Sequence, residues 1–260
     1  MNIKGLKPNA KLRKNAYFWP MKSKVLGKLY LIPVMMGEES NPKDVLPESV
    51  AKTIEMIDHY IVENEKTARR HIKKILPEKK QPELKIRLLN KHTDNKEFSE
   101  MLQPCLDGIN VGLMSEAGCP AIADPGAAIV KIAHQKGIQV VPMVGPSSIL
   151  MAMMGSGFNG QSFAFNGYLP IDKQEKKNAL KSFERLSIDK NQSQIFIETP
   201  YRNNKLLEDL LQILQPHTLL CIAADITLET EFIQTKKVSE WKKTKVDLHN
   251  RPCIFILSKD

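Results

Sequence analysis

The chain has 260 residues, 42% of them hydrophobic and 26% charged, with a formal net charge of +9. This composition is ordinary for a globular protein with a sizeable core. No apolar run approaches the roughly eighteen residues that a bilayer span requires, and no apolar segment follows the basic N-terminus, which excludes a membrane span and a secretory signal.

Basic charge is concentrated at the N-terminus. Residues 1–28 hold eight Lys and Arg and no acidic residue, whereas the rest of the chain holds 30 basic and 29 acidic residues, a net of +1. Residues 1–27 are therefore interpreted as a basic leader before a nearly neutral body. Three interpretations of the leader are open: an RNA-contacting arm, a disordered tail, or sequence upstream of a true initiator methionine at Met21.

The four cysteines are widely separated and include no C-x-x-C pair. They are Cys105, Cys119, Cys221 and Cys253. Reduced thiols in a cytoplasmic protein are the simplest interpretation, and we expect neither a disulfide framework nor a metal site.

Strands and helices alternate through residues 28–143. Helical spacing of apolar residues, such as Val50, Ile54 and Ile57, predicts helices, and short apolar runs predict buried strands. Strands are expected at 29–34, 60–62, 84–89, 109–114 and 138–141. Helices are expected at 47–57, 63–76, 96–106 and 127–135. This alternation is typical of a mainly parallel sheet, so residues 28–143 are predicted to form an N-terminal α/β domain.

A second α/β unit is predicted for residues 144–260, with the boundary between Met143 and Pro146. Helices are expected at 146–154, 172–186, 203–214 and 239–243. Strands are expected at 162–166, 194–197, 218–223, 231–235 and 253–257. The last two strands flank only a short helix, which is typical of antiparallel pairing, so the second sheet is predicted to be mixed.

Two loops rich in glycine and proline follow neighbouring apolar strands, at 115–126 and 142–148. Glycine lets the backbone approach a ligand without a Cβ in the way, and proline fixes the turn. Open α/β sheets bind ligands beyond the carboxyl ends of their strands, so the two loops together predict a binding cleft. Either loop alone would be an ordinary turn. A dinucleotide site is not expected, because the first strand is followed by a single glycine, Gly37.

Several ordered motifs resemble a known family. They are MSEAGCPAIADPG (114–126), VVPMVGPSSILMAMMGSG (140–157), FAFNGYLP (163–170), IFIETPYR (195–202), LYLIPVMMG (29–37) and ENEKTARR (63–70). In this order they resemble the tetrapyrrole methylase superfamily, the class III S-adenosylmethionine methyltransferases. Within it the likeness is greatest to the bacterial ribosomal small-subunit RNA cytidine-2′-O-methyltransferases, and it spans residues 28–258.

The chain also departs from that family's pattern. The family's PIGN loop is replaced at Met35–Glu38, its EDTR motif at Glu63–Lys66, and its ARELTK stretch at 223–227. Arg251 and Pro252 replace an acidic pair before the last strand, and the small C-terminal helical domain of many members is not in the sequence. Because the cofactor is contacted mainly by the main chain, these side-chain changes should affect its binding little. They should affect recognition of the methyl acceptor more, since that depends on side chains.

The resemblance implies that S-adenosylmethionine lies in a cleft between the two domains. The residues that it implies for cofactor binding are Pro33, Ser115, Glu116, Ala117, Gly118, Pro120, Ile122, Asp124, Val144, Gly145, Ser147, Ser148, Tyr168, Leu169 and Ala223. Ser147 or Ser148 is also expected to cap the helix that follows. Since the sulfonium donor is already activated, catalysis would consist mainly of aligning the acceptor with the methyl group.

Four charged residues are candidates for catalysis. Glu63 and Glu198 are interpreted as acid/base or orienting carboxylates, and Arg69 and Arg202 as binders of phosphate or acceptor, since Arg matches phosphate geometry. Glu63 and Arg69 are equally consistent with a solvated pair on a charged helix. A run of basic residues follows, and it is either an RNA-facing patch or a solvated face. The run consists of Lys66, His71, Lys73, Lys74, Lys79 and Lys80.

Three functional hypotheses remain open from the sequence. The leading one is a cytoplasmic methyltransferase that acts on a ribose 2′-hydroxyl of small-subunit ribosomal RNA. The second is a methyltransferase of the same fold that acts on a small molecule such as a tetrapyrrole, which the nearly neutral body favours. The third is a non-catalytic relative that binds S-adenosylmethionine or RNA. The resemblance also implies a homodimer.

Overall fold

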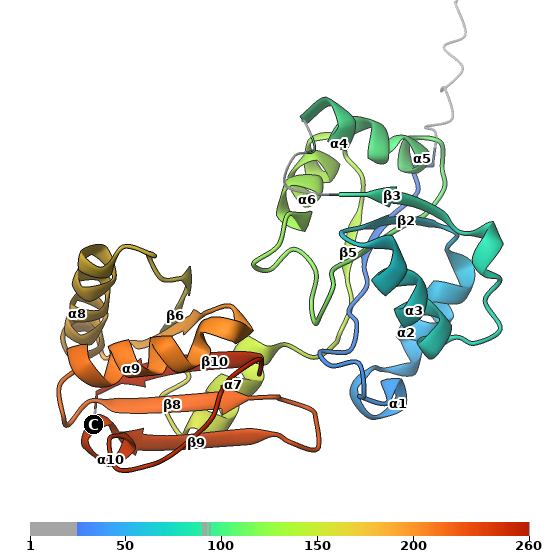
Figure 1. Ribbon diagram of the computed structural model, residues 1–260. Coiled ribbons are helices and arrows are strands. Elements are labelled where there is room, and N and C mark those ends of the chain that lie inside the picture. Colours follow the sequence, from blue (N-terminus) through green and yellow to red (C-terminus); the bar gives the residue numbers. More distant parts are fainter. Residues whose placement is uncertain (1–24, 90–92, 94, 260) are drawn as a thin grey trace, which may run out of the picture.

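The computed structural model (Figure 1) describes residues 25–89, 93 and 95–259. The predicted basic leader therefore lies outside the described residues, apart from residues 25–27. Among the described residues, no helix combines the length and the apolar character needed to span a membrane.

The first half of the chain forms a five-stranded sheet in which every strand is parallel. The strands are β1 (Leu29–Leu31), β2 (His59–Val62), β3 (Lys85–Leu88), β4 (Val111–Met114) and β5 (Val140–Pro142). Their order is β3-β2-β4-β1-β5, so β1 and β4 lie side by side. The parallel arrangement is the predicted one. All carboxyl ends of the strands meet at one edge, where the loops after β1, β2, β4 and β5 gather.

Helices cover both faces of this sheet because alternate strand residues point to opposite sides. Tyr60 and Val62 of β2 pack with α1 (Pro42–Val45), α2 (Glu48–Met56) and α3 (Glu65–Ile75), whereas Ile61 packs on the opposite face. The opposite layer consists of α4 (Asn95–Met101), α5 (Gln103–Leu106) and α6 (Gly126–Gln135). The connections from β1 and β4 thus leave towards opposite faces, which opens a crevice between their carboxyl ends.

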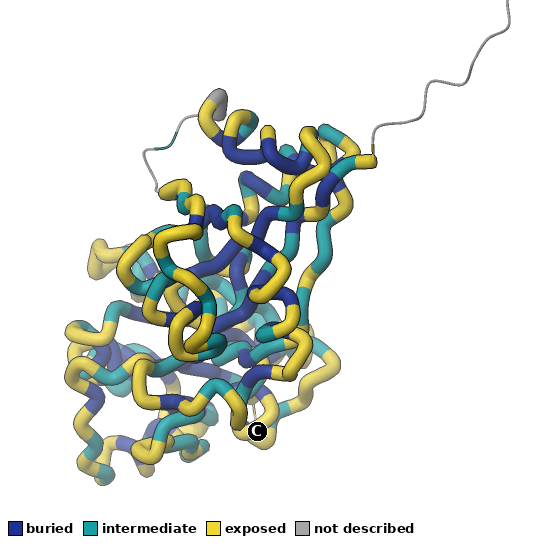
Figure 2. Tube along the Cα trace, turned by 90° about the vertical axis from the view of Figure 1, so that its right-hand side faces the viewer, coloured by how far each residue is buried: buried dark blue, intermediate teal, exposed yellow. Residues whose placement is uncertain are grey.

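The second half of the chain forms a mixed sheet, also as predicted. Its strands are β6 (Phe163–Tyr168), β7 (Ser193–Ile197), β8 (Leu219–Ala224), β9 (Phe232–Lys237) and β10 (Cys253–Ser258). In the order β6-β7-β10-β8-β9, only the first pair is parallel. On one face lie α8 (Lys173–Lys190), α9 (Asn203–Ile213) and α10 (Val238–Trp241), and α7 (Ser148–Ser156) covers the other. Figure 2 shows the buried strands inside a largely exposed outer layer.

The predicted helix at 96–106 is wrong in one respect, because it is two helices that break at Leu102. Pro104 has no N–H to donate to the carbonyl of Glu100, and that carbonyl accepts a hydrogen bond from Arg87 instead, at 2.8 Å. Short elements were also missed: α1, and two 3-10 turns at Gln81–Glu83 and Pro200–Arg202.

Candidate functional site

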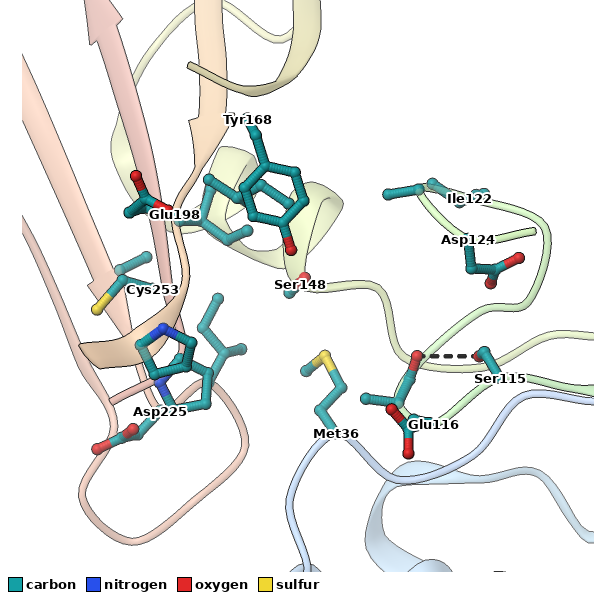
Figure 3. A pocket seen from close by; sticks show the side chains of 18 of the residues that line it. Met36, Ser115, Glu116, Ile122, Asp124, Ser148, Tyr168, Glu198, Asp225 and Cys253 are labelled. Atoms are coloured by element: carbon teal, nitrogen blue, oxygen red, sulfur yellow. Dashed lines mark hydrogen bonds between the residues drawn. The ribbon is translucent and has the colours of Figure 1, made fainter. Parts of the chain in front are cut away.

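A cavity of about 380 Å³ lies where the carboxyl edge of the first sheet faces the second sheet. The first sheet contributes Met36, Glu63 and the loop 115–124, and the second contributes Tyr168, Glu198 and residues 223–228 among others. Figure 3 shows Met36, Ser148 and Tyr168 converging from separate elements, opposite the loop that carries Ile122 and Asp124. An adjoining cavity of about 170 Å³ extends the space towards Gly118 and Ser147. Together their size is typical of a small-molecule site.

The loop after β4 is held in shape by its own aspartate. The Asp124 carboxylate accepts hydrogen bonds from the backbone N–H of Ala121 at 2.9 Å and of Gly126 at 2.7 Å. Ala121 and Ala123 have φ of +68° and +62°, a conformation that costs an L-residue about 1–2 kcal/mol. Backbone strain of this kind clusters at functional sites, and Ala123 itself lines the cavity.

Gly118 lies where three loops meet. Its carbonyl accepts a hydrogen bond from the N–H of Val34 at 3.0 Å, which ties the loop after β4 to the chain leaving β1. The φ of Gly118 is +66°, and a Cβ added there would lie 3.3 Å from the carbonyl oxygen of Pro146. Glycine is therefore favoured here both by the positive φ and by the tight contact.

The second glycine-proline loop leads directly into α7. Ser147 caps this helix, and its hydroxyl accepts the N–H of Leu150 at 3.5 Å, which confirms the predicted cap. Ser148 lines both cavities. Gly145 packs so tightly on Pro33 that an added Cβ would lie 2.2 Å from the proline Cβ, so these two residues support the loop.

Glu63 follows β2 and lines the main cavity. Partial burial raises the pKa of its carboxyl to about 7, and the nearby charges of Asp124 and Glu116 act in the same direction. A hydrogen bond from the Glu116 backbone opposes them. A carboxylate with this pKa is suited to accept a proton near neutral pH.

His71 is not part of a basic surface patch, which corrects one of the sequence interpretations. It is 4% exposed, and its Nε2 lies 3.1 Å from the carbonyl oxygen of Glu116. Burial lowers the pKa of His71, so the neutral ring is favoured, and its Nε2–H donates to that carbonyl. The imidazole thus supports the loop after β4 from beneath.

Glu198 and Arg202 form a pair at the second wall of the cavity. Glu198 is 8% exposed, and its Oε1 accepts from Arg202 NH2 at 2.6 Å, from Arg202 Nε at 3.1 Å and from the N–H of Thr199 at 2.7 Å. Within the described residues, the hydrogen bonds to this carboxylate all go to Oε1. The hydrogen bonds that Arg202 donates to Glu198 raise the pKa of the Arg202 guanidinium. Arg202 lines a further cavity of about 320 Å³, which shares Glu198 with the main one.

Arg69 lies outside the main cavity. Its Nε and NH2 donate to Glu65, each at 2.8 Å, and its NH1 donates to the carbonyl of Gln81 at 2.6 Å. The structure therefore does not bring Arg69 together with Glu63, and its donors are engaged within the first domain.

Most of the predicted cofactor residues lie together. Those that line one of the two adjoining cavities are Ser115, Glu116, Ala117, Gly118, Ile122, Asp124, Ser147, Ser148, Tyr168 and Ala223. Those that line neither are Pro33, Pro120, Val144, Gly145 and Leu169. Leu169 is buried in the core of the second sheet, and Val144 is 76% exposed.

Several lining residues were not predicted. They are Met36, Ala123, Ile197, Pro200, Asp225, Ile226, Leu228, Pro252, Cys253 and Ile254. Asp225 is the charged one, and it is buried, with φ of +51° and an ion pair to Arg251 at 2.7 Å. The sequence held a signal for Asp225, because residues 223–227 occupy the position of the family's ARELTK motif.

The part of the chain that the structure describes has no cluster of three or more potential metal ligands. All four cysteines, which lie within it, are free thiols. Burial raises the pKa of Cys221 to about 11, so its thiol is unreactive.

Comparison with known proteins identifies relatives of this chain. The family model of the Tetrapyrrole (Corrin/Porphyrin) Methylases matches residues 40–241. The ribosomal RNA small subunit methyltransferase I of Vibrio cholerae is 32% identical over 58% of this chain and 51% of its own length. The protein of the same name from Halalkalibacterium halodurans is 31% identical over 80% of this chain and 68% of its own length. The match thus spans about half of the first relative and two thirds of the second.

Solved structures share the fold. The uroporphyrin-III C-methyl transferase of Thermus thermophilus, complexed with S-adenyl homocysteine, superposes with a TM-score of 0.54 at 16% identity. The superposition covers 89% of this chain and 97% of that one. This likeness confirms the predicted architecture of two α/β sheets.

Proposed function

We propose, since this chain belongs to the tetrapyrrole (corrin/porphyrin) methylase family, that it transfers a methyl group to a ribose 2′-hydroxyl of small-subunit ribosomal RNA. The family match and the names of the relatives support the coarser predictions, which are a methyltransferase and S-adenosylmethionine as its donor. Ribosomal RNA as the acceptor is supported by the names of the relatives, and the 2′-hydroxyl by the motifs that the sequence shares with that branch.

One observation supports the proposal above others. The glycine-proline loop and Glu63 line the same cavity, so a donor site and a proton acceptor lie together. The cavity offers the residues that such a donor requires: close main-chain approach at Ala117 and Gly118, the hydroxyl of Ser148, and apolar contacts from Ile122 and Ile197. Both the size and this mixture of groups fit S-adenosylmethionine.

The donor supplies a methyl group on a positively charged sulfur, which is already a good leaving group. The protein has to hold the acceptor oxygen in line with that methyl group and to remove its proton. We assign the proton transfer to Glu63, because its pKa of about 7 leaves much of it ionised at neutral pH. Glu198 and Arg202 orient the acceptor from the opposite wall.

Glu198→Gln keeps the shape of the side chain and removes its charge. We expect the Kd for S-adenosylmethionine to stay within about twofold and kcat to fall roughly ten- to a hundredfold, because an orienting group acts on the acceptor. Calorimetric titration and single-turnover methylation measure the two effects. Glu208→Gln is the matched control, since Glu208 is an exposed carboxylate of α9 that pairs with Lys205. Wild-type turnover of Glu198→Gln would remove Glu198 from the reaction.

Deletion of the gene, followed by mapping of methylated riboses in the small-subunit RNA, tests the acceptor. The proposal predicts that one 2′-O-methyl group disappears and returns when the gene is restored. An unchanged ribose map, with S-adenosylmethionine still bound by the purified protein, would favour a small-molecule acceptor such as a tetrapyrrole. Failure to bind S-adenosylmethionine would contradict the donor as well. We also propose a cytoplasmic location, because the proposed substrate is ribosomal RNA.

We also propose that two copies of the chain associate. Val144, Leu150 and Met154 are 76%, 52% and 83% exposed, and they line a shallow apolar groove between α1 and α7. Exposed apolar patches of this kind typically mark protein interfaces. Light scattering after gel filtration is expected to give twice the 29.4 kDa of one chain, and Met154→Lys to shift the protein to the monomer. A wild-type monomer at micromolar concentration would contradict this expectation.

A further inference from the structure

We propose that the outer face of α3 binds the phosphate backbone of the RNA substrate beside the cavity. The face consists of Lys66, Arg70 and Lys73, here called the α3 stripe. This inference rests on the proposed function and adds to it the surface that holds the RNA. It concerns contacts to phosphates, which position an RNA without reading its sequence.

The α3 stripe is set apart from the core by helical geometry. Five of the eleven residues of α3 are Lys or Arg and one is acidic, while Ala68, His71 and Ile72 are buried on the inner side. The stripe residues are spaced i, i+4 and i+7, so they share one side of the helix. At about 1.5 Å per residue, Lys66 and Lys73 are roughly 10 Å apart along the axis.

Lys66 and Arg70 do not stabilise the helix, whereas Lys73 lies in the last turn, where a cation is favourable. Like charges four residues apart, as at Lys66 and Arg70, cost about 0.2–0.5 kcal/mol for each pair. A cation in the first turn, such as Lys66, is also unfavourable beside the positive end of the helix dipole. The Lys66 and Arg70 pair opposes the stability of its own helix, which supports a role for these two charges outside the fold.

The side chains of the α3 stripe have N–H groups available to donate hydrogen bonds to phosphate. Lys66 and Lys73 have no hydrogen-bond or ion-pair partner among the described residues. Arg70 pairs only with Glu38, and both side chains are largely exposed, at 46% and 70%. An exposed pair of this kind is worth only about 0–1 kcal/mol, so a phosphate can replace Glu38. The donors of Arg69 are instead held by Glu65 and Gln81, so the phosphate role belongs to its neighbours.

The stripe borders an open groove and lies on the helix that follows Glu63. Arg70 and Lys73, with Arg69, Lys74 and Gln81, line an open groove of about 500 Å³. Lys66 is three residues from Glu63, and the inner side of the same helix contacts the loop after β4 through His71. A ribose held at Glu63 therefore has neighbouring phosphates within reach of α3.

The test is the triple variant Lys66→Gln, Arg70→Gln, Lys73→Gln, with binding of a fluorescein-labelled single-stranded RNA oligonucleotide measured by anisotropy between about 50 and 300 mM KCl. We expect the Kd to rise at least about tenfold at low salt. The slope of log Kd against log[KCl] should fall by about 2, since each phosphate contact to single-stranded RNA contributes about 0.7. The Kd for S-adenosylmethionine should not change, which also shows that the variant is folded.

The matched control removes three lysines from the far side of the second sheet, by Lys242→Gln, Lys243→Gln and Lys245→Gln. These follow or end α10, which lies at the opposite end of the molecule from α3 (Figure 1). The inference is overturned if the stripe variant keeps its affinity and slope, or if the control loses as much. It is also overturned if the loss occurs only with whole small subunits, since the face would then contact a ribosomal protein. If the wild-type protein binds RNA but not S-adenosylmethionine, and the stripe variant loses RNA binding while its thermal melt stays that of the wild type, the proposed function is contradicted and the RNA surface is supported.

Discussion

Glu63→Gln is expected to lower kcat/KM for methyl transfer by about a hundredfold or more, because general-base catalysis typically contributes about 10²–10⁴-fold. In the wild-type protein, kcat/KM should rise with pH and level off above about 7, since the base works when it is ionised. The variant should lose this dependence. Initial rates with labelled S-adenosylmethionine, measured across this pH range, give both results.

The matched control is Glu65→Gln, which removes an exposed carboxylate two residues away that pairs with Arg69. Its rate should stay within about twofold of wild type. A pH profile in Glu63→Gln identical to that of the wild-type protein would assign the proton transfer to another group.

The same carboxyl links stability to pH. The folded pKa of Glu63 is about 7 against an ordinary value of 4.5, so between these values the native state binds more protons than the unfolded state. The contribution of the protonated Glu63 carboxyl to the free energy of unfolding is therefore fully present at low pH. It is lost as the pH rises through 7. Glu63→Gln should accordingly raise the Tm relative to wild type more at pH 8 than at pH 5, as measured by thermal melting.

Gly118→Val should abolish measurable binding of S-adenosylmethionine. The residue has a φ of +66°, and a Cβ there would lie 3.3 Å from the carbonyl of Pro146, in a loop that lines the site. A β-branched side chain would force the loop out of the conformation that Asp124 and Val34 maintain. Calorimetric titration should show the Kd rising by at least about a hundredfold.

Gly137→Val separates loop geometry from general strain. Gly137 has nearly the same φ, +69°, but an added Cβ meets nothing within 4 Å. We expect this control to lose about 1–2 kcal/mol of stability and to keep cofactor affinity. Equal loss of binding in both variants would show that the effect is global, and retained binding in Gly118→Val would remove the loop from the cofactor site.

The sequence predicts the two-sheet architecture well, because the apolar runs, the helical spacing and the turn residues all indicate the same helices and strands. Apolar runs and helical spacing place every described strand and most helices, and the comparisons confirm the family and the fold. The error at Leu102 concerns a local exception, since Pro104 breaks a helix whose apolar spacing continues. The assigned site residues remain predictions that the variants above test.

The lining residues beyond the two loops follow from packing between the sheets, which one sequence does not reveal. Asp225 approaches the cavity because β8 ends there in a left-handed turn that Arg251 holds, 26 positions along the chain. Glu63 acquires its raised pKa from burial and from Asp124, a residue of another loop. His71 was predictable in principle, because Ala68, His71 and Ile72 share the inner side of α3.

Methyl transfer to small ribosomal subunits from a strain that lacks the gene tests the central claim most directly. The purified protein is incubated with S-adenosylmethionine labelled in the methyl group, and the RNA is then hydrolysed with alkali. A 2′-O-methyl group blocks cleavage of the adjacent phosphodiester, so our account predicts label in one alkali-resistant dinucleotide. Label in single nucleotides would place the methyl group on a base, and no incorporation into RNA by a protein that binds the donor would contradict the proposed acceptor.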